Sequence, residues 1–132
     1  MLTTVVTAPA GAHFPAQTAY AIDPAELMAM LERTPDEVFI VDVQDPEVFE
    51  VGHIPGSRNI HLDDLCTVCA ELPKDRTIVI YCGDVSCGLP LWAALELAQE
   101  GFRTKYLHGG LAEWTKSALP VEISPPPPDP EY

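Results

Sequence analysis

Short apolar runs separated by stretches with helical spacing fill the middle of the chain. Continuous apolar runs of this length are typical of strands buried on both faces of a parallel sheet. The most strand-like run is TIVIY at residues 77–81. We predict strands at residues 38–43, 57–62, 77–81 and 105–107.

Helix-start signals precede the stretches between these runs. Asp23 is placed as an N-cap, with Pro24 at the first helical position and Glu26 closing a capping box. We predict helices over residues 24–33, 45–51, from 63 or 64 to about 71, 90–100 and 111–117. A chain in which strands and helices alternate forms a three-layer α/β domain with a mainly parallel sheet. Ligands of such sheets bind beyond the carboxyl ends of the strands. The residues after Tyr81 therefore lie at the predicted site.

The two ends of the chain lack these patterns. Residues 1–17 show neither period, and we predict an irregular segment there. Residues 124–132 read SPPPPDPEY, which favours an extended polyproline II tail. The domain is therefore expected to span residues 18–123. No stretch of 18 apolar residues is present, and the first basic residue is Arg33, so we expect neither a membrane span nor a secretory signal.

Charge narrows the choice of partners. The 132 residues contain 7 Lys and Arg against 20 Asp and Glu, a formal net charge of −13. Binding to a phosphate backbone or an anionic membrane surface needs clustered basic residues, so we expect neither nucleic acid nor membrane as a partner. A protein partner would approach faster if it offered a basic face.

Four cysteines are too few to form a disulfide scaffold in a domain of this size, and we expect a reducing, cytoplasmic location. Cys82 directly follows the strongest predicted strand, and a loop joins it to the helix at Pro90. Loop N–H groups and the positive end of that helix would both favour a thiolate. The alternative is a small buried residue that closes the strand.

Cys66 and Cys69 form a CxxC pair. A zinc site would need two further ligands, and recruiting Cys82 would remove the nucleophile, so we expect no metal. A local redox pair is an alternative, but packing of the helix is the favoured role. His61 could reach the site as a proton donor or ligand; a partly exposed histidine at the end of a strand is the more common outcome.

Several segments together resemble the rhodanese-like family of single-domain proteins. The similarity runs in order from about residue 18 to 122. The matching segments are IVDV with DPEVF at residues 40–49, GHIPGSRNI at 52–60, LPKD at 72–75, IVIYC at 78–82, GF at 101–102 and GGLAEW at 109–114.

The resemblance implies a three-layer α/β/α sulfurtransferase fold with a mainly parallel central sheet of about five strands. It implies that Cys82 is the nucleophile and becomes a persulfide, with no cofactor. Asp42 would support the site by orienting loops, Gly109 and Gly110 would allow close packing beside the loop, and His53 would be structural. Backbone N–H groups would hold the transferred sulfur along the loop Gly83, Asp84, Val85, Ser86, Cys87 and Gly88.

The loop departs from the common family pattern. Val85 and Cys87 stand where glycine and arginine are usual, and Gln44 replaces an arginine after the first-strand aspartate. From residue 77 through 102 the chain has no Lys or Arg. We therefore expect weak activity with the thiosulfate dianion, and a polysulfide or protein persulfide as donor to a thiol acceptor. The same absence argues against the related phosphatases and arsenate reductases, which need a loop arginine.

The spacing Cys82-x4-Cys87 is similar to a recurring subgroup of the family. Cys87 could resolve a Cys82 persulfide as a disulfide, which requires the Cα atoms to come within about 7 Å. It could equally pack in the place of the arginine. Two other functions stay open: a thiol–disulfide redox or sensing protein, and a non-catalytic binding module.

Overall fold

The computed structural model describes residues 20–83 and 88–123. Five strands form one sheet in the order β1-β5-β4-β2-β3, and every neighbouring pair is parallel. All carboxyl ends therefore lie at one edge of the sheet. The strands are β1 (Ala21–Ile22), β2 (Val38–Asp42), β3 (Arg58–Asn59), β4 (Thr77–Tyr81) and β5 (Arg103–Leu107).

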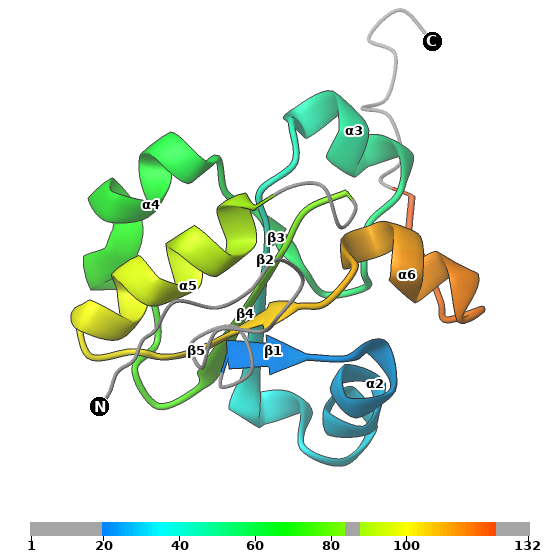
Figure 1. Ribbon diagram of the computed structural model, residues 1–132, viewed down its shortest axis with the longest axis horizontal. Helices are drawn as coiled ribbons and strands as arrows, with labels where there is room; N and C mark the ends of the chain where they lie inside the picture. Colours follow the sequence, from blue (N-terminus) through cyan, green and yellow to red (C-terminus); the bar gives the residue numbers. More distant parts are fainter. Residues whose placement is uncertain (1–19, 84–87, 124–132) are drawn as a thin grey trace, which may run out of the picture.

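Helices cover both faces of this sheet. Figure 1 shows α4 and α5 on one side, and α2 and α6 on the other. This is the three-layer arrangement predicted from the sequence. The helices are α2 (Pro24–Arg33), α3 (Pro46–Val51), α4 (Leu62–Val68), α5 (Leu89–Gln99) and α6 (Gly110–Lys116), with 3-10 helices at Pro35–Glu37 and Cys69–Glu71.

The predicted capping box of α2 is present. The Asp23 carboxylate accepts from the Glu26 N–H at 2.8 Å, and the Glu26 carboxylate accepts from the Asp23 N–H at 3.0 Å. These bonds satisfy two donors that a helix start leaves open. Leu27 is fully buried, and Met28 and Leu31 pack on the same cluster, so this face of α2 covers the sheet.

Alternate residues of the central strands pack into two separate hydrophobic cores. Val41 and Ile80 face α4 and α5, and pack with Leu65 and Leu97 among others. The opposite side chains, including Ile40, Val79 and Tyr81, face α2 and α6 and pack around Leu27 and the fully buried Trp114. Strands buried on both faces explain the uninterrupted apolar runs in the sequence.

The structure corrects several predicted bounds. Strand β1 was not predicted; it has only two residues, too few for a visible period. Strand β3 covers Arg58–Asn59 rather than residues 57–62, because α4 already begins at Leu62. Strand β5 begins at Arg103, two residues earlier than predicted, and its buried Thr104 donates its hydroxyl to the Ala94 carbonyl at 2.8 Å.

The irregular segment predicted at residues 1–17 and the tail predicted at 124–132 lie outside the described residues. Within residues 20–83 and 88–123, no helix combines the length and apolar character needed to cross a bilayer.

Candidate active site

Cys82 follows the last residue of β4, at the carboxyl edge of the sheet. It is half-buried and packs against the core under α4 and α5. Its carbonyl accepts from the Leu111 N–H at 2.9 Å, and the Gly83 carbonyl accepts from the Ala112 N–H at 2.8 Å. The first turn of α6 thus holds the backbone on which the thiol stands.

Two glycines turn the chain into α6 beside Cys82. Gly109 has φ +79° and Gly110 has φ +62°, which are left-handed values that favour glycine. A Cβ on Gly109 would also fall on the Cβ of Glu113. The close packing expected of these glycines is present, and it directs the N–H groups of α6 at the Cys82 backbone.

Cys82 lines an open hollow of about 350 Å³ at this edge. The hollow has the size of a small-molecule site. Its side walls come from the loop after β2, from α3 and from the start of α5. The lining residues are Val43, Gln44, Asp45, Val48, Cys82, Gly83 and Leu89.

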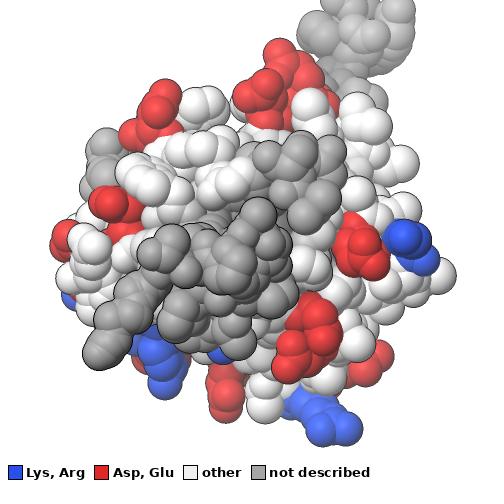
Figure 2. Space-filling view, in the orientation of Figure 1, with Lys and Arg blue, Asp and Glu red and all other residues white. Residues whose placement is uncertain are grey.

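Among the described residues that line the hollow, none has a positive side chain, and the charged one is Asp45. The arginines and lysines that flank β4 and β5, among them Lys74 and Arg103, lie at the amino edge of the sheet. Figure 2 shows acidic side chains over α3, while Lys and Arg lie toward the lower and right-hand margins of the face. The described part of the lining therefore offers an anion no attraction from a basic side chain.

Helix α5 supplies the nearest positive potential. Its N-cap is Gly88, its first residue Leu89 lines the hollow, and Pro90 occupies an N-terminal position where no N–H is needed. No acidic residue lies in the first turn to cancel the helix dipole. The end of an eleven-residue helix with its open N–H groups favours negative charge beside it.

Asp42 lies on the other face of the sheet from this hollow. It is fully buried, and its carboxylate accepts from the Gln44 N–H at 2.7 Å and from the Gln44 side-chain amide at 2.9 Å. Burial raises the pKa of Asp42, although hydrogen bonds from Tyr81 and Gln44 lower it. The expected supporting role agrees with these contacts, since Asp42 orders the loop after β2 and does not line the hollow.

The Tyr81 hydroxyl connects Asp42 to the segment at residues 54–57. It donates to Asp42, accepts from the Ile54 N–H at 2.9 Å and lies 3.3 Å from the Ser57 hydroxyl. Burial, followed by the charge of Asp42, raises the pKa of Tyr81. The residue immediately before Cys82 is therefore fixed at both its backbone and its side chain.

Gln44 reaches from this network to the Cys82 loop. It is buried, and its side-chain oxygen lies 3.4 Å from the position that a Cβ on Gly83 would occupy. The Asn59 amide donates to the carbonyls of Asp42 and Gln44 at 3.0 and 2.8 Å, which fixes the loop after β2. Gln44 thus connects the Asp42 network to the Cys82 loop through a neutral side chain.

The two histidines considered in the sequence have structural positions. His53 is buried, stacks on Phe49 and has its Nδ1 2.7 Å from the Phe49 carbonyl, as expected of a structural residue. His61 is the N-cap of α4, where its Nδ1 accepts from the Asp63 N–H at 3.2 Å. His61 is absent from the described lining of the hollow, and a role there as a proton donor or ligand stays a prediction.

Cys69 packs against the α5-side core, as expected for helix packing. The side chain of Cys66 and the loop residues Asp84, Val85, Ser86 and Cys87 lie outside the description. No three described His, Cys, Asp or Glu side chains are grouped in a way that could hold a metal ion.

Sequence reasoning missed the hollow's rim and its support. Val48 and Leu89 are 47% and 43% exposed at the rim. Nothing in the sequence pattern around Val48 in α3 or Leu89 at the start of α5 indicates that these apolar side chains are exposed. Tyr81 could have been found, because a tyrosine that ends a buried strand needs a partner for its hydroxyl.

The sequence profile described as Rhodanese-like domain matches residues 23–117. The chain is 34% identical over 101 residues to "Sulfurtransferase" of Allochromatium vinosum, covering 76% of this chain and 92% of that protein. It is 39% identical over 106 residues to "HTH-type transcriptional regulator Rv0324" of Mycobacterium tuberculosis. That match covers 80% of this chain but only 46% of the regulator, so the chain spans less than half of that relative.

Two further comparisons agree. "Thiosulfate sulfurtransferase GlpE" of Pseudoalteromonas translucida is 32% identical over 93 residues, covering 68% of this chain and 83% of that protein. The crystal structure of the BH2092 protein from Bacillus halodurans superposes with a TM-score of 0.73 at 32% identity, covering 81% of this chain and 79% of the other. On the profile match and these likenesses, the chain belongs to the rhodanese-like family.

Proposed function

We propose that the protein is a sulfurtransferase in which Cys82 takes a sulfane sulfur from a donor and passes it to a thiol. The observation that carries this proposal is the position of Cys82 at the end of β4, where it lines a hollow at the carboxyl edge of the sheet. The sulfurtransferase names of two relatives support it.

The reaction has two balanced steps. The Cys82 thiolate attacks a sulfane sulfur; a new S–S bond forms, the donor's S–S bond breaks, and its electron pair leaves with the shortened donor. An acceptor thiolate then attacks the outer sulfur of the Cys82 persulfide, the bond to Sγ breaks, and the Cys82 thiolate is restored. The acceptor leaves as a persulfide, and the enzyme undergoes no net oxidation or reduction.

The donor we propose is a polysulfide or a protein persulfide. Thiosulfate is a dianion, and the lining residues that the structure describes offer it the Asp45 carboxylate and no Lys or Arg. The amino end of α5 provides only about half a positive charge. A donor with one negative charge, or with none at its sulfur, is repelled less by this site than thiosulfate is.

The acceptor we propose is a thiol, which can be carried by a protein. Val48 and Leu89 give the hollow a partly exposed apolar rim on which the residues around an acceptor cysteine could rest. Such thiols stay reduced in a reducing compartment, and we place the protein there.

Intact-protein mass spectrometry tests the mechanism after incubation with polysulfide and, separately, with thiosulfate. We expect polysulfide to add one sulfur atom to the wild type and to Cys69→Ser, but not to Cys82→Ser. Cys69 is a matched control because it is also half-buried and packs on the same core. Sulfur transfer that persists in Cys82→Ser would refute the proposed nucleophile.

The variant Cys87→Ser separates sulfur transfer from a redox function. If Cys82 carries the sulfur alone, Cys87→Ser gains the same sulfur atom as the wild type. Loss of two hydrogen atoms that requires both Cys82 and Cys87 would instead indicate a disulfide and a redox or sensing protein. No reaction of Cys82 in any sample would leave a binding module with this fold.

A further inference from the structure

A second pocket lies on the opposite face of the sheet, at the other end from Cys82. Its volume is about 390 Å³, within the range of ligand sites. Val38 begins β2 and Arg76 directly precedes β4, so the pocket reaches the amino edge of the sheet, whereas Cys82 follows the carboxyl end of β4. The pocket and the Cys82 hollow share no lining residue.

The walls of this pocket are almost entirely apolar. They come from α2, the following 3-10 helix, the first half of β2, the turn after Ile54, and α6. Ile40 and Trp114 are buried in the protein yet line this space. The lining residues are Met28, Leu31, Pro35, Val38, Ile40, Pro55, Gly56, Arg76, Trp114 and Pro120.

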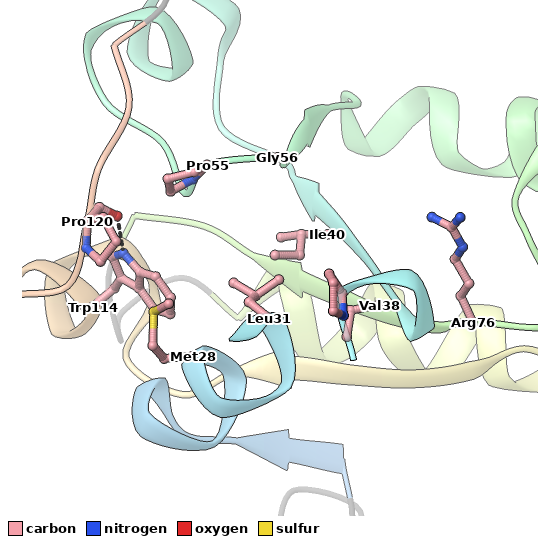
Figure 3. A pocket seen from close by; sticks show the side chains of 10 residues that line it. Met28, Leu31, Val38, Ile40, Pro55, Gly56, Arg76, Trp114 and Pro120 are labelled. Atoms are coloured by element: carbon pink, nitrogen blue, oxygen red, sulfur yellow. Dashed lines mark hydrogen bonds between the residues drawn. The ribbon is translucent and has the colours of Figure 1, made fainter. Parts of the chain in front are cut away.

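The polar atom of the tryptophan is already satisfied. The Trp114 indole N–H donates to the Pro120 carbonyl at 2.7 Å, which is the dashed line in Figure 3. The turn that carries Pro55 is fixed in turn by the bond from the Ile54 N–H to Tyr81. These contacts hold the walls in place without a ligand. The indole N–H already has an acceptor, so a ligand in the pocket need not supply one.

Arg76 is the exception to the apolar lining. It is half-buried, and within the described residues no hydrogen bond, ion pair or ring contact involves its guanidinium. Other described basic side chains do have such contacts: Arg58 lies over Phe39, and Lys74 over Phe102. A half-buried cation without a partner is costly, and an anion placed there would offset that cost.

The pocket is elongated, with its charge at one end. In Figure 3, Trp114, Met28 and Pro120 lie together, Leu31 and Ile40 lie in the middle, and Arg76 stands beyond Val38 at the far end. A ligand that fits needs an apolar body along the wall and a single negative head at Arg76. A guanidinium binds a carboxylate through two parallel hydrogen bonds.

We propose that this pocket binds an elongated apolar carboxylate, such as a medium-chain fatty acid, with its chain against Trp114 and Leu31 and its head at Arg76. Asp36, Glu37 and Asp75, which adjoin Pro35, Val38 and Arg76 in sequence, are exposed and do not line it. The overall charge of −13 repels anions at long range, and this repulsion is screened at physiological salt.

Calorimetric titration with decanoate, decanol and decylammonium tests the proposal on the full chain. The three probes share one chain and differ only in the charge of the head. We expect decanoate to bind at least about tenfold more tightly than decanol, and decylammonium to bind weakest. Octanoate should bind more weakly than decanoate, because each buried methylene contributes up to about fourfold.

Variants at the two ends of the pocket identify the site. Arg76→Gln should weaken decanoate binding about tenfold and leave decanol binding unchanged. Arg33→Gln is the matched control, since Arg33 is an exposed arginine of α2 outside the lining, and it should bind both probes like the wild type. Leu31→Phe should weaken both probes, because the larger ring fills the middle of the pocket.

Trp114 reports on the location of the ligand. The chain has two tryptophans, and Trp92→Phe removes the half-exposed one. In that background decanoate should change the emission of Trp114. Equal affinity for decanoate and decanol, an unchanged affinity in Arg76→Gln, or an unchanged Trp114 emission at saturation would each overturn the proposal.

Discussion

The side-chain amide of Gln44 donates a hydrogen bond of 2.9 Å to the buried carboxylate of Asp42. The oxygen of the same amide faces Gly83, beside Cys82. One neutral side chain therefore connects the buried network under the sheet edge to the loop that carries the thiol. Because this side chain is neutral, the part of the hollow's lining that the structure describes contains no positive side chain.

Gln44→Arg should make the site accept thiosulfate. The new guanidinium keeps a partner in Asp42 and adds a positive charge beside Gly83, where the hollow now has none. We expect the second-order rate of Cys82 persulfide formation from thiosulfate to rise about tenfold, since a charge several ångströms away near a surface contributes on the order of 1 kcal/mol after screening. Rates followed by mass spectrometry measure the change.

The matched control is Gln44→Met, which has a similar volume but no charge and no amide. It should not speed the reaction with thiosulfate, because the loss of two hydrogen-bonding groups brings no attraction for a dianion. Equal acceleration in Gln44→Met and Gln44→Arg would show that the size of the side chain, rather than its charge, limits the reaction.

Asp45→Asn tests the negative charge of the hollow directly. Asp45 is exposed, lines the hollow and makes no capping hydrogen bond to α3, so its replacement costs little stability. We expect the thiosulfate rate to rise about two- to threefold at low ionic strength, with the gain shrinking at high salt. Asp36→Asn removes an exposed carboxylate from the 3-10 helix before β2 and should leave the rate unchanged. A gain that is insensitive to salt would contradict the electrostatic explanation.

Much of this fold was predictable because its signals are local. The capping box of Asp23 and Glu26 needs only four residues of sequence. The uninterrupted apolar run of β4 indicates by itself that the strand is buried. The two-residue strand β1 was not predictable in this way. It exists because Ala21 and Ile22 pair with Tyr106 and Leu107, more than eighty positions further along the chain.

The same distinction between local signals and distant contacts applies to the site. Placing Cys82 required only the end of a strand and the rule that ligands bind at that edge. The contact between Gln44 and Gly83, and the bonds from α6 to the Cys82 carbonyl, depend on segments that are distant in sequence. The N-cap role of His61 could not be predicted, because it depends on where α4 begins, and the predicted start was one or two residues late.

Asp42→Asn should change how stability depends on pH. Because burial raises the pKa of Asp42, the native state holds its proton more tightly than the unfolded chain does. The carboxyl therefore contributes stability below its ordinary value of 3.8, and this contribution is lost as the pH rises through the higher native value. Urea denaturation at a series of pH values should show the wild type losing stability relative to Asp42→Asn from near pH 3.8 toward neutrality.

Tyr81→Phe provides the companion variant. It removes a hydrogen bond that lowers the pKa of Asp42, so the same loss of stability should extend to higher pH than in the wild type. It also leaves the buried Ile54 N–H without an acceptor, which should lower the free energy of unfolding by about 1–3 kcal/mol at any pH. A wild type that gained stability relative to Asp42→Asn as the pH rises would reverse the sign and refute this explanation.

Gly109→Ala should weaken both the fold and the active site. The left-handed backbone there costs an alanine about 1–2 kcal/mol, and its Cβ would fall on the Cβ of Glu113. We expect the free energy of unfolding to fall by about 2–4 kcal/mol. Relief of the contact must move the start of α6, whose N–H groups hold the carbonyls of Cys82 and Gly83. Persulfide formation at Cys82 should therefore slow under conditions in which the variant is still folded.

Gly88→Ala is the matched control, because it tests whether replacing any glycine near the loop has the same effect as Gly109→Ala. Gly88 has an ordinary φ of −88°, and a Cβ there meets no atom of the described residues within 4 Å, so we expect a change in stability below about 0.5 kcal/mol. Urea denaturation gives the stabilities, and the rate of sulfur uptake from polysulfide gives the activity. If Gly109→Ala lost stability but kept the wild-type rate while folded, the bonds from α6 would support the fold without positioning Cys82. A slower rate in Gly109→Ala alone would show that the turn before α6 sets the position of the thiol.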